Sequence, residues 1–215
     1  MNHLDFKKYK KIALVGGAFD PIHFGHLATA QAVYDAFDVE KVIFLPLGDA
    51  PHKDLSSTAA VQRYDMISKS IEDNKAFAIS DIEIKREGKT YTVDTIREII
   101  SINGDIEIYF VMGADEIVSI DTWKDPENLL KMCKLIAVNR PKYDTEFVDS
   151  EIKKAEDKFN CDIFCLEIPE LDISSTDLRN RIRSGKSITY LLPKEAENYI
   201  MEHNLYKEGD SSCLK

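Results

Sequence analysis

Cysteine is scarce in this sequence, and the shortage excludes one class of protein. Four cysteines at irregular spacing in 215 residues are too few for the disulfide framework of a small secreted scaffold. Cys161 and Cys165 are four residues apart in an expected strand, so their side chains should point to the same face. We interpret them as small core residues, with a metal or redox role as the alternative.

Long apolar runs are also missing. No segment approaches the roughly 18 apolar residues of a membrane span. Residues 1–11 contain four lysines but no apolar stretch follows them, which argues against a signal peptide. Cys213 lies too close to the C-terminus for a prenylation motif. We therefore expect a cytoplasmic protein that does not bind membranes.

Positive charge is in deficit. The sequence has 28 Lys and Arg against 38 Asp and Glu, a net charge of -10. Broad binding of nucleic acid needs a basic face, so the balance argues against it. A small anionic ligand in a local basic pocket remains compatible with this charge. The hydrophobic content of 44% and the length are typical of one globular domain.

Short β-branched runs alternate with helical patterns along the chain. This order predicts an α/β fold with a doubly wound, mostly parallel sheet, helices on both faces and helices at the C-terminal end. We expect one domain over residues 1–206 and a polar tail over 207–215. The expected strands are 12–15, 41–46, 77–84, 106–112, 135–138 and 163–168, and the expected helices are 24–37, 59–72, 92–102, 147–159, 175–183 and 193–203.

The first strand runs into a turn that suits phosphate. Gly16 and Gly17 let the backbone approach a ligand closely, and the following helix offers free N–H groups. His23 and His26 are three residues apart at the first helical turn, and Gly25 places no side chain between them. The spacing matches neither a dinucleotide fingerprint nor a P-loop. Capping and a metal pair are the alternatives for the histidines.

A second candidate anion site opens the helix expected at 175–183. Three hydroxyl residues, Ser174, Ser175 and Thr176, precede Arg179, whose side chain can reach back toward them. An ordinary cap formed by Ser174 and Asp177 explains the segment equally well.

These motifs occur together with several others in a fixed order. The others are Ala50-Pro51-His52-Lys53, Arg63-Tyr64-Asp65-Met66, Tyr91-Thr92-Val93-Asp94-Thr95, Met112-Gly113-Ala114-Asp115 with Trp123, and Tyr199-Ile200 to Leu205-Tyr206. The ordered set spans nearly the whole chain and resembles bacterial nicotinate-nucleotide adenylyltransferases of the nucleotidylyltransferase superfamily. The resemblance implies a Rossmann-like fold and adenylyl transfer from ATP to nicotinate mononucleotide, giving deamido-NAD and pyrophosphate. Alternatives are another adenylyl- or cytidylyltransferase, for example one acting on phosphopantetheine, or a non-catalytic nucleotide-binding protein.

The resemblance also implies roles for individual residues. Catalysis would fall to His23, His26 and Arg179. ATP binding would fall to Gly16, Gly17, Ala18, Phe19, Asp20, Gly113, Asp115, Ser174, Ser175 and Thr176. Nicotinate mononucleotide binding would fall to His52, Lys53, Tyr91, Thr92, Trp123 and Arg140. Ordinary structural roles compete with several of these: an N-cap for Asp115, a core position for Trp123, a solvated loop position for Lys53, capping for Tyr91 and Thr92, and an ion pair with Asp144 for Arg140.

No protein metal site is expected, and Mg²⁺ would arrive with the ATP phosphates. A homo-oligomer is left open. The sequence departs from the family pattern at two positions. Ala18 stands where threonine or serine is usual, and Leu47 where asparagine is common. The second change leaves the choice between nicotinate and nicotinamide mononucleotide less certain.

Overall fold

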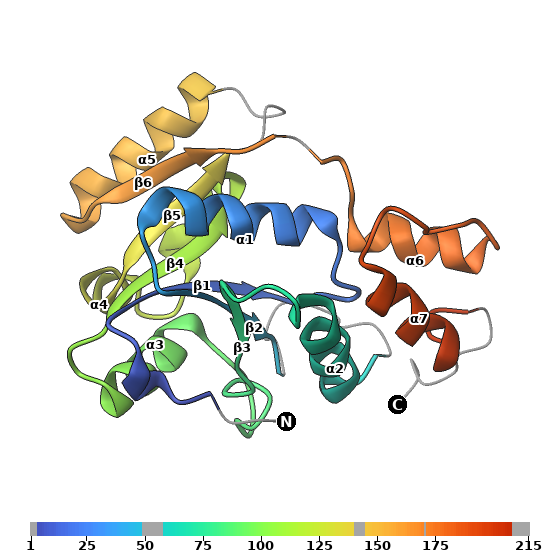
Figure 1. The fold of residues 1–215 in the computed structure, drawn as a ribbon. Helices are drawn as coiled ribbons and strands as arrows, with labels where there is room; N and C mark the ends of the chain where they lie inside the picture. The colour runs from blue at the N-terminus through green and yellow to red at the C-terminus, as the bar shows by residue number, and fades with distance from the viewer. Residues whose placement is uncertain (1–3, 49–57, 140–144, 170, 208–215) are drawn as a thin grey trace.

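A six-stranded parallel sheet forms the centre of the molecule. The computed structural model describes residues 4–48, 58–139, 145–169 and 171–207 (Figure 1). The strand order is β3-β2-β1-β4-β5-β6, so the winding direction reverses between β1 and β4. This confirms the doubly wound α/β prediction. The strands are β1 (Lys11–Gly17), β2 (Lys41–Pro46), β3 (Phe77–Ile79), β4 (Glu107–Gly113), β5 (Lys134–Asn139) and β6 (Ile163–Glu167).

Two apolar clusters cover the two faces of the sheet. Successive residues of a strand point to opposite faces, so Ala13 and Val15 join one cluster and Ile12 and Leu14 the other. The first cluster packs against α1 (Phe24–Phe37), α2 (Ala60–Ile71), α6 (Ser175–Arg183) and α7 (Lys194–Glu202). The second packs against η1 (Phe6–Lys8), α3 (Thr92–Ile102), η2 (Ala114–Thr122), α4 (Pro126–Met132) and α5 (Thr145–Phe159).

The C-terminal helices lie beside the N-terminal end of α1. Figure 1 shows α6 and α7 next to each other at the end of the sheet where α1 begins, and α7 packs against α2. Leu205 and Tyr206 are still buried. Residues 208–215 lie outside the described part of the chain, so the domain boundary expected after residue 206 stays a prediction. Within the described residues, no helix has both the length and the apolar character needed to cross a bilayer.

The strand expected at 77–84 is too long, because β3 ends at Ile79. The N–H of Ser80 still donates to the carbonyl of Phe44, but the next donor on β2 would belong to Pro46, which has no N–H. The ladder therefore ends there, although the apolar alternation continues. The structure also contains η2 and α4, which the sequence pattern did not predict.

The interpretation of the cysteines is partly wrong. Cys133 is buried, and Cys161 is half-buried against the second apolar cluster. Cys165, however, is exposed on β6, so it is not a core residue.

Candidate active site

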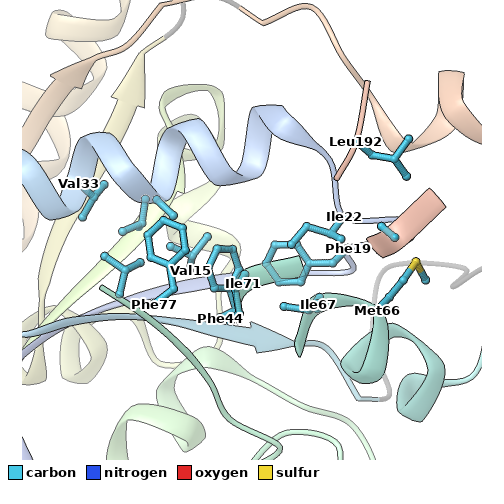
Figure 2. Close-up of a cluster of buried hydrophobic side chains, with 14 of the residues drawn as sticks. Val15, Phe19, Ile22, Val33, Phe44, Met66, Ile67, Ile71, Phe77 and Leu192 are labelled. Atoms are coloured by element: carbon cyan, nitrogen blue, oxygen red, sulfur yellow. The ribbon is translucent and has the colours of Figure 1, made fainter. Parts of the chain in front are cut away.

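The turn after β1 is anchored in the core by its apolar side chains. Phe19 and Ile22 are buried against Phe44, Met66 and Ile67 (Figure 2). Phe19 has a left-handed backbone with φ 49°, which turns the chain sharply. A Cβ on Gly17 would lie 3.0 Å from the Phe19 ring, so glycine suits the close approach there. The anchored side chains leave the backbone of the turn at the carboxyl edge of the sheet.

His23 and His26 lie against each other at the start of α1. Their ring centroids are 3.7 Å apart with an interplanar angle of 27°. His23 is buried and His26 is half-buried. A Cβ on Gly25 would lie 3.0 Å from the His23 ring, which explains why the residue between them carries no side chain.

The hydrogen bonding of His26 fixes what its ring offers. The backbone N–H of His23 donates to Nδ1 of His26 at 3.2 Å. A ring nitrogen that accepts carries no proton, so the proton of this imidazole is on Nε2. His26 therefore presents a neutral donor in this geometry. It can stabilise a phosphate oxygen by hydrogen bonding, without adding a full positive charge.

The N-terminus of α6 lies on the turn after β1. Arg179 donates through Nη1 to the carbonyl of Asp20 at 2.7 Å, and the hydroxyl of Ser175 donates to the carbonyl of Pro21 at 2.9 Å. These contacts join residues more than 150 positions apart in the sequence. The structure thus brings the two predicted phosphate-binding segments together.

The three hydroxyl residues before Arg179 have different surroundings. Ser174 is the N-cap of α6, and its Oγ accepts from the N–H of Asp177 at 3.0 Å. The capping alternative is therefore correct for Ser174. Thr176 is exposed, and its Oγ1 accepts from Nη2 of Arg179 at 3.2 Å, so both face the same side of the helix.

Asp20, within the turn, has a buried side chain that binds Tyr206, a residue after the end of α7. The hydroxyl of Tyr206 donates to Oδ1 of Asp20. Burial, together with the adjacent carboxylate, raises the pKa of Tyr206 well above its ordinary range, which keeps the hydroxyl protonated as a donor. The contact predicted for Asp20 is a backbone contact, and its carboxylate binds Tyr206 inside the protein.

Gly113 and Asp115 lie at the carboxyl end of β4, next to the reversal in strand order. Gly113 is the N-cap of η2, so the N-cap alternative for Asp115 is wrong. A Cβ on Gly113 would collide with Oδ1 of Asp115. Asp115 itself is exposed in the first turn of η2, and a carboxylate in that place can accept hydrogen bonds from ribose hydroxyls.

Tyr91 and Trp123 pack on the same apolar cluster, on the face opposite the histidine pair. Trp123 is half-buried, with its ring 6.0 Å from that of Phe110 and nearly perpendicular to it. Lys124 lies 4.5 Å from the centre of the Tyr91 ring, which connects the start of α3 with the end of η2. Tyr91 is the N-cap of α3 without a side-chain cap, so capping does not explain its side chain. Thr92 is the first residue of that helix.

Three predicted residues, His52, Lys53 and Arg140, lie outside the described residues. Leu47 is described, and its N–H donates to the carbonyl of Gly17 at 3.0 Å. Its backbone therefore extends the pairing of β1 and β2 by one step.

Comparison with known proteins identifies the family. A cytidylyltransferase-like family model matches residues 14–181. The chain is 43% identical over 204 residues to a probable nicotinate-nucleotide adenylyltransferase of Thermoanaerobacter sp. strain X514, covering 94% of this chain and 97% of that protein. The chain belongs to the nicotinate-nucleotide adenylyltransferase family. A relative named in the same way, from Desulfitobacterium hafniense strain DCB-2, is 40% identical over 199 residues and covers 92% of this chain and 96% of its own.

Solved structures agree on the fold. Plasmodium falciparum nicotinic acid mononucleotide adenylyltransferase, complexed with NaAD, superimposes with a TM-score of 0.76 at 22% identity, covering 92% of this chain and 98% of that chain. Its complex with APC gives 0.73 at 21% identity. At these identities the likeness establishes a shared architecture.

The buried charged residues of this nicotinate-nucleotide adenylyltransferase family member that were not predicted include Arg63 and Glu83. Arg63 is almost completely buried on the core side of α2, and Glu83 is buried between β3 and α3. A sequence signal existed for Arg63, because it lies three and four residues before Met66 and Ile67 on the apolar side of an amphipathic helix. For Glu83 the apolar alternation of its neighbours suggested a strand instead.

Glu83 is held in a polar chain that ends at the surface. Thr95 donates to Oε1 of Glu83 at 2.9 Å and accepts from Arg86 at 2.7 Å, and Arg86 also binds Glu98. Burial raises the pKa of Glu83 from 4.5 to about 7, although Thr95 and Arg86 act in the opposite direction. A Cβ on Gly48 would collide with the carbonyl of Glu83, so the loop after β2 touches this segment directly.

The donors around the turn are unlike those of a protein-held metal. Over the residues the structure describes, no three His, Cys, Asp or Glu side chains gather in a way that could hold an ion. Asp20, the carboxylate of the turn, is already bound by Tyr206. Hard Mg²⁺ prefers oxygen ligands, whereas the side chains that meet at this turn are two imidazoles and a guanidinium.

A surface hollow of about 510 Å³ lies elsewhere, beside the end of α2 and the start of β3. Lys41, Lys69 and Phe77 line it. It is at the opposite end of these strands from the turn, and it takes no part in the candidate site.

Proposed function

We propose that this chain transfers the adenylyl group of ATP to nicotinate mononucleotide, giving deamido-NAD and pyrophosphate. The observation that carries the proposal is the convergence of His23, His26 and Arg179 on one glycine turn at the carboxyl edge of the sheet. Membership of the family supplies the identity of the substrates.

The reaction needs no general base from the protein. The nucleophile is the phosphate of nicotinate mononucleotide, whose second pKa is about 6, so it is already ionised at neutral pH. One of its oxygens bonds to the α-phosphorus of ATP, and the bond from that phosphorus to the bridging oxygen breaks as pyrophosphate leaves. Catalysis therefore consists of alignment and of stabilising charge on phosphate oxygens.

The residues of the turn fit that requirement. We assign the Nε2–H of His26, together with His23, to the α-phosphate as its charge develops. We assign Arg179, with Ser175 and Thr176, to the β- and γ-phosphates of the leaving group. The N-termini of α1 and α6 add further N–H groups and the positive ends of their dipoles.

Mg²⁺ enters the proposal as a companion of ATP. When bound to the β- and γ-phosphates it supplies positive charge that neutralises the leaving group. The chain itself would hold the phosphates with Arg179 and the helix N-termini. Phosphate oxygens and water would coordinate the metal.

The nicotinate mononucleotide side is assigned to the opposite face of the sheet from the histidine pair, near the carboxyl end of β4. Trp123 can stack on a pyridine ring, and the backbone N–H groups at Tyr91 and Thr92 can meet its carboxylate. His52, Lys53 and Arg140 are assigned to this substrate from the sequence alone. A cytoplasmic location and the oligomeric state likewise remain predictions from the sequence.

A comparison of three acceptors tests the proposal. Purified protein with ATP and Mg²⁺ should release pyrophosphate with nicotinate mononucleotide faster than with nicotinamide mononucleotide or phosphopantetheine. Faster release with phosphopantetheine would assign the chain to another branch of the superfamily. No release with any acceptor, from protein that binds ATP, would favour a non-catalytic nucleotide-binding protein.

A further inference from the structure

Arg63 is a buried guanidinium that touches two loops at once. It lies on the core-facing side of α2 with only 1% of its surface exposed. Its Nη1 donates to the carbonyl of Ala18 and its Nη2 donates to the carbonyl of Leu47, both at 2.6 Å. Those carbonyls are 45 and 16 residues away in the sequence, so the contacts are tertiary.

The two carbonyls stand where two neighbouring strands part. The pairing of β1 and β2 ends at Gly17 and Pro46, and the N–H of Leu47 makes one more bond to Gly17. Beyond this point one chain continues toward His23 and the other toward Gly48. Arg63 therefore bonds both loops at the first position where the sheet no longer holds them together.

A charged side chain is a costly way to fill this position. Burial lowers the pKa of Arg63 from its ordinary value, and nearby Asp20 and Tyr206 act in the opposite direction. An apolar side chain of similar length would pack there without the desolvation cost. The side chains of Ala18 and Leu47 carry no polar group. Hydrogen bonds can therefore hold these two residues in place only through their backbone groups. A planar guanidinium can bind two separate carbonyls at fixed angles, which an ammonium group cannot.

We propose that Arg63 is a positioning residue that sets the separation between the backbone at Ala18 and the backbone at Leu47, where the segments after β1 and β2 begin. The inference rests on the proposed function, in which the first loop binds ATP and the second leads to the other substrate. In-line transfer requires the attacking oxygen and the α-phosphorus to be aligned, and a misplacement of about 1 Å can cost about 100-fold in rate. Arg63 acts through the two loops and touches neither substrate.

The test compares Arg63→Lys and Arg63→Met with wild type. Lys retains the charge but bonds one carbonyl well, and Met retains the length but bonds neither. We expect kcat to fall about 10- to 100-fold in both, while the KM for each substrate and the Kd for each substrate alone change by less than about 3-fold. Lys69→Met, an exposed position of the same helix, is the matched control and should leave kcat unchanged.

The outcomes separate positioning from folding. A folded Arg63→Met variant with wild-type kcat would overturn the proposal. A loss of activity that matches the fraction of unfolded protein in each variant would also overturn the proposal. Failure of both variants to fold would do the same. Either result assigns Arg63 to stability alone. Wild-type protein is assayed in parallel. If it shows no turnover, the proposed function fails, whereas an active wild type with fully active variants contradicts only the role of Arg63.

Discussion

At the phosphate end of the candidate site, the turn from Gly16 to His26 is bound by side chains that come from α2, α6 and the segment after α7. At the proposed pyridine end, formed by Tyr91, Thr92 and Trp123, the side chains of Tyr91 and Trp123 rest on apolar neighbours and on ring contacts. The first end is fixed by hydrogen bonds over long sequence distances, in addition to the packing of Phe19 and Ile22. The second is fixed mainly by packing.

This difference fits the ligand groups that we propose for each end. Charge that develops on phosphate oxygens is stabilised by donors whose directions are set in advance. The carbonyl of Asp20 helps to set the direction of one such donor, because it accepts a hydrogen bond from Arg179. A pyridine ring offers a flat apolar face, which an aromatic side chain on a packed core can match. The comparison therefore predicts that variants at the phosphate end change kcat and that variants at the pyridine end change KM.

The largest effect is expected for His26→Ala. Removing one preorganised donor to a developing oxyanion costs about 100- to 1,000-fold in kcat. Steady-state pyrophosphate release should show this loss with a much smaller change in KM. His203→Ala, at an exposed histidine after α7, is the control. A kcat near that of wild type would remove His26 from the catalytic role.

The next effect is a pH dependence of stability at the pyridine end. The pKa of Glu83 is about 7 in the folded chain and 4.5 without burial, so the folded state binds the proton more tightly between these values. Its favourable contribution is complete below pH 4.5 and is lost as the pH rises through about 7. The span of about 2.5 pH units corresponds to about 3 kcal/mol.

Glu83→Gln tests this contribution. The variant should lose most of the decline in unfolding free energy between pH 5 and pH 8, measured by denaturant titration. Glu98→Gln changes the exposed end of the same polar chain and should keep the decline. An unchanged decline in Glu83→Gln would show that another group is responsible.

A smaller effect is expected for Trp123→Ala. Stacking of a base on an aromatic side chain contributes about 1–3 kcal/mol, so the KM for nicotinate mononucleotide should rise about tenfold or more. The KM for ATP should stay the same, and Trp123→Phe should recover most of the difference. Equal increases in both KM values would mean that Trp123 acts by supporting the core around Phe110.

The smallest effect on activity is expected for Tyr206→Phe, which removes the donor to Asp20. Leaving a buried carboxylate with one fewer partner costs about 1–3 kcal/mol. Thermal unfolding should register this as a lower Tm, by about 2–4 °C per kcal/mol for a chain of this length. Tyr190→Phe is the matched control, because Tyr190 is 89% exposed. Equal Tm values for the two variants would argue against the Asp20 contact.

Local signals explain which parts of the fold could be predicted. The helices Phe24–Phe37 and Thr92–Ile102 begin and end as expected, and so does the strand Lys41–Pro46, which a proline closes. For α4, proline at the first position was a start signal that went unused. The end of β3 depends on the missing N–H of a residue in another strand, and no local pattern contains that information.

In the candidate site, too, some residues could be predicted from local sequence and others could not. The histidine pair and Arg179 were predicted because glycine spacing, helix starts and charge are visible in short motifs. Arg63 and Tyr206 occur in motifs that pointed to the family, but nothing in their own neighbourhood indicated that they bind the turn after β1. Their partners are 45 and 186 residues away, and only the folded topology brings them close.

The contact between Tyr206 and Asp20 also constrains the order of events during synthesis. Asp20, in the turn with the two histidines, is translated 186 residues before the tyrosine whose hydroxyl binds it. A nascent chain that stops before residue 206 carries every predicted phosphate ligand but leaves the Asp20 carboxylate without that donor. The hydrogen bond that stabilises the Asp20 carboxylate can therefore form only after translation has passed Tyr206.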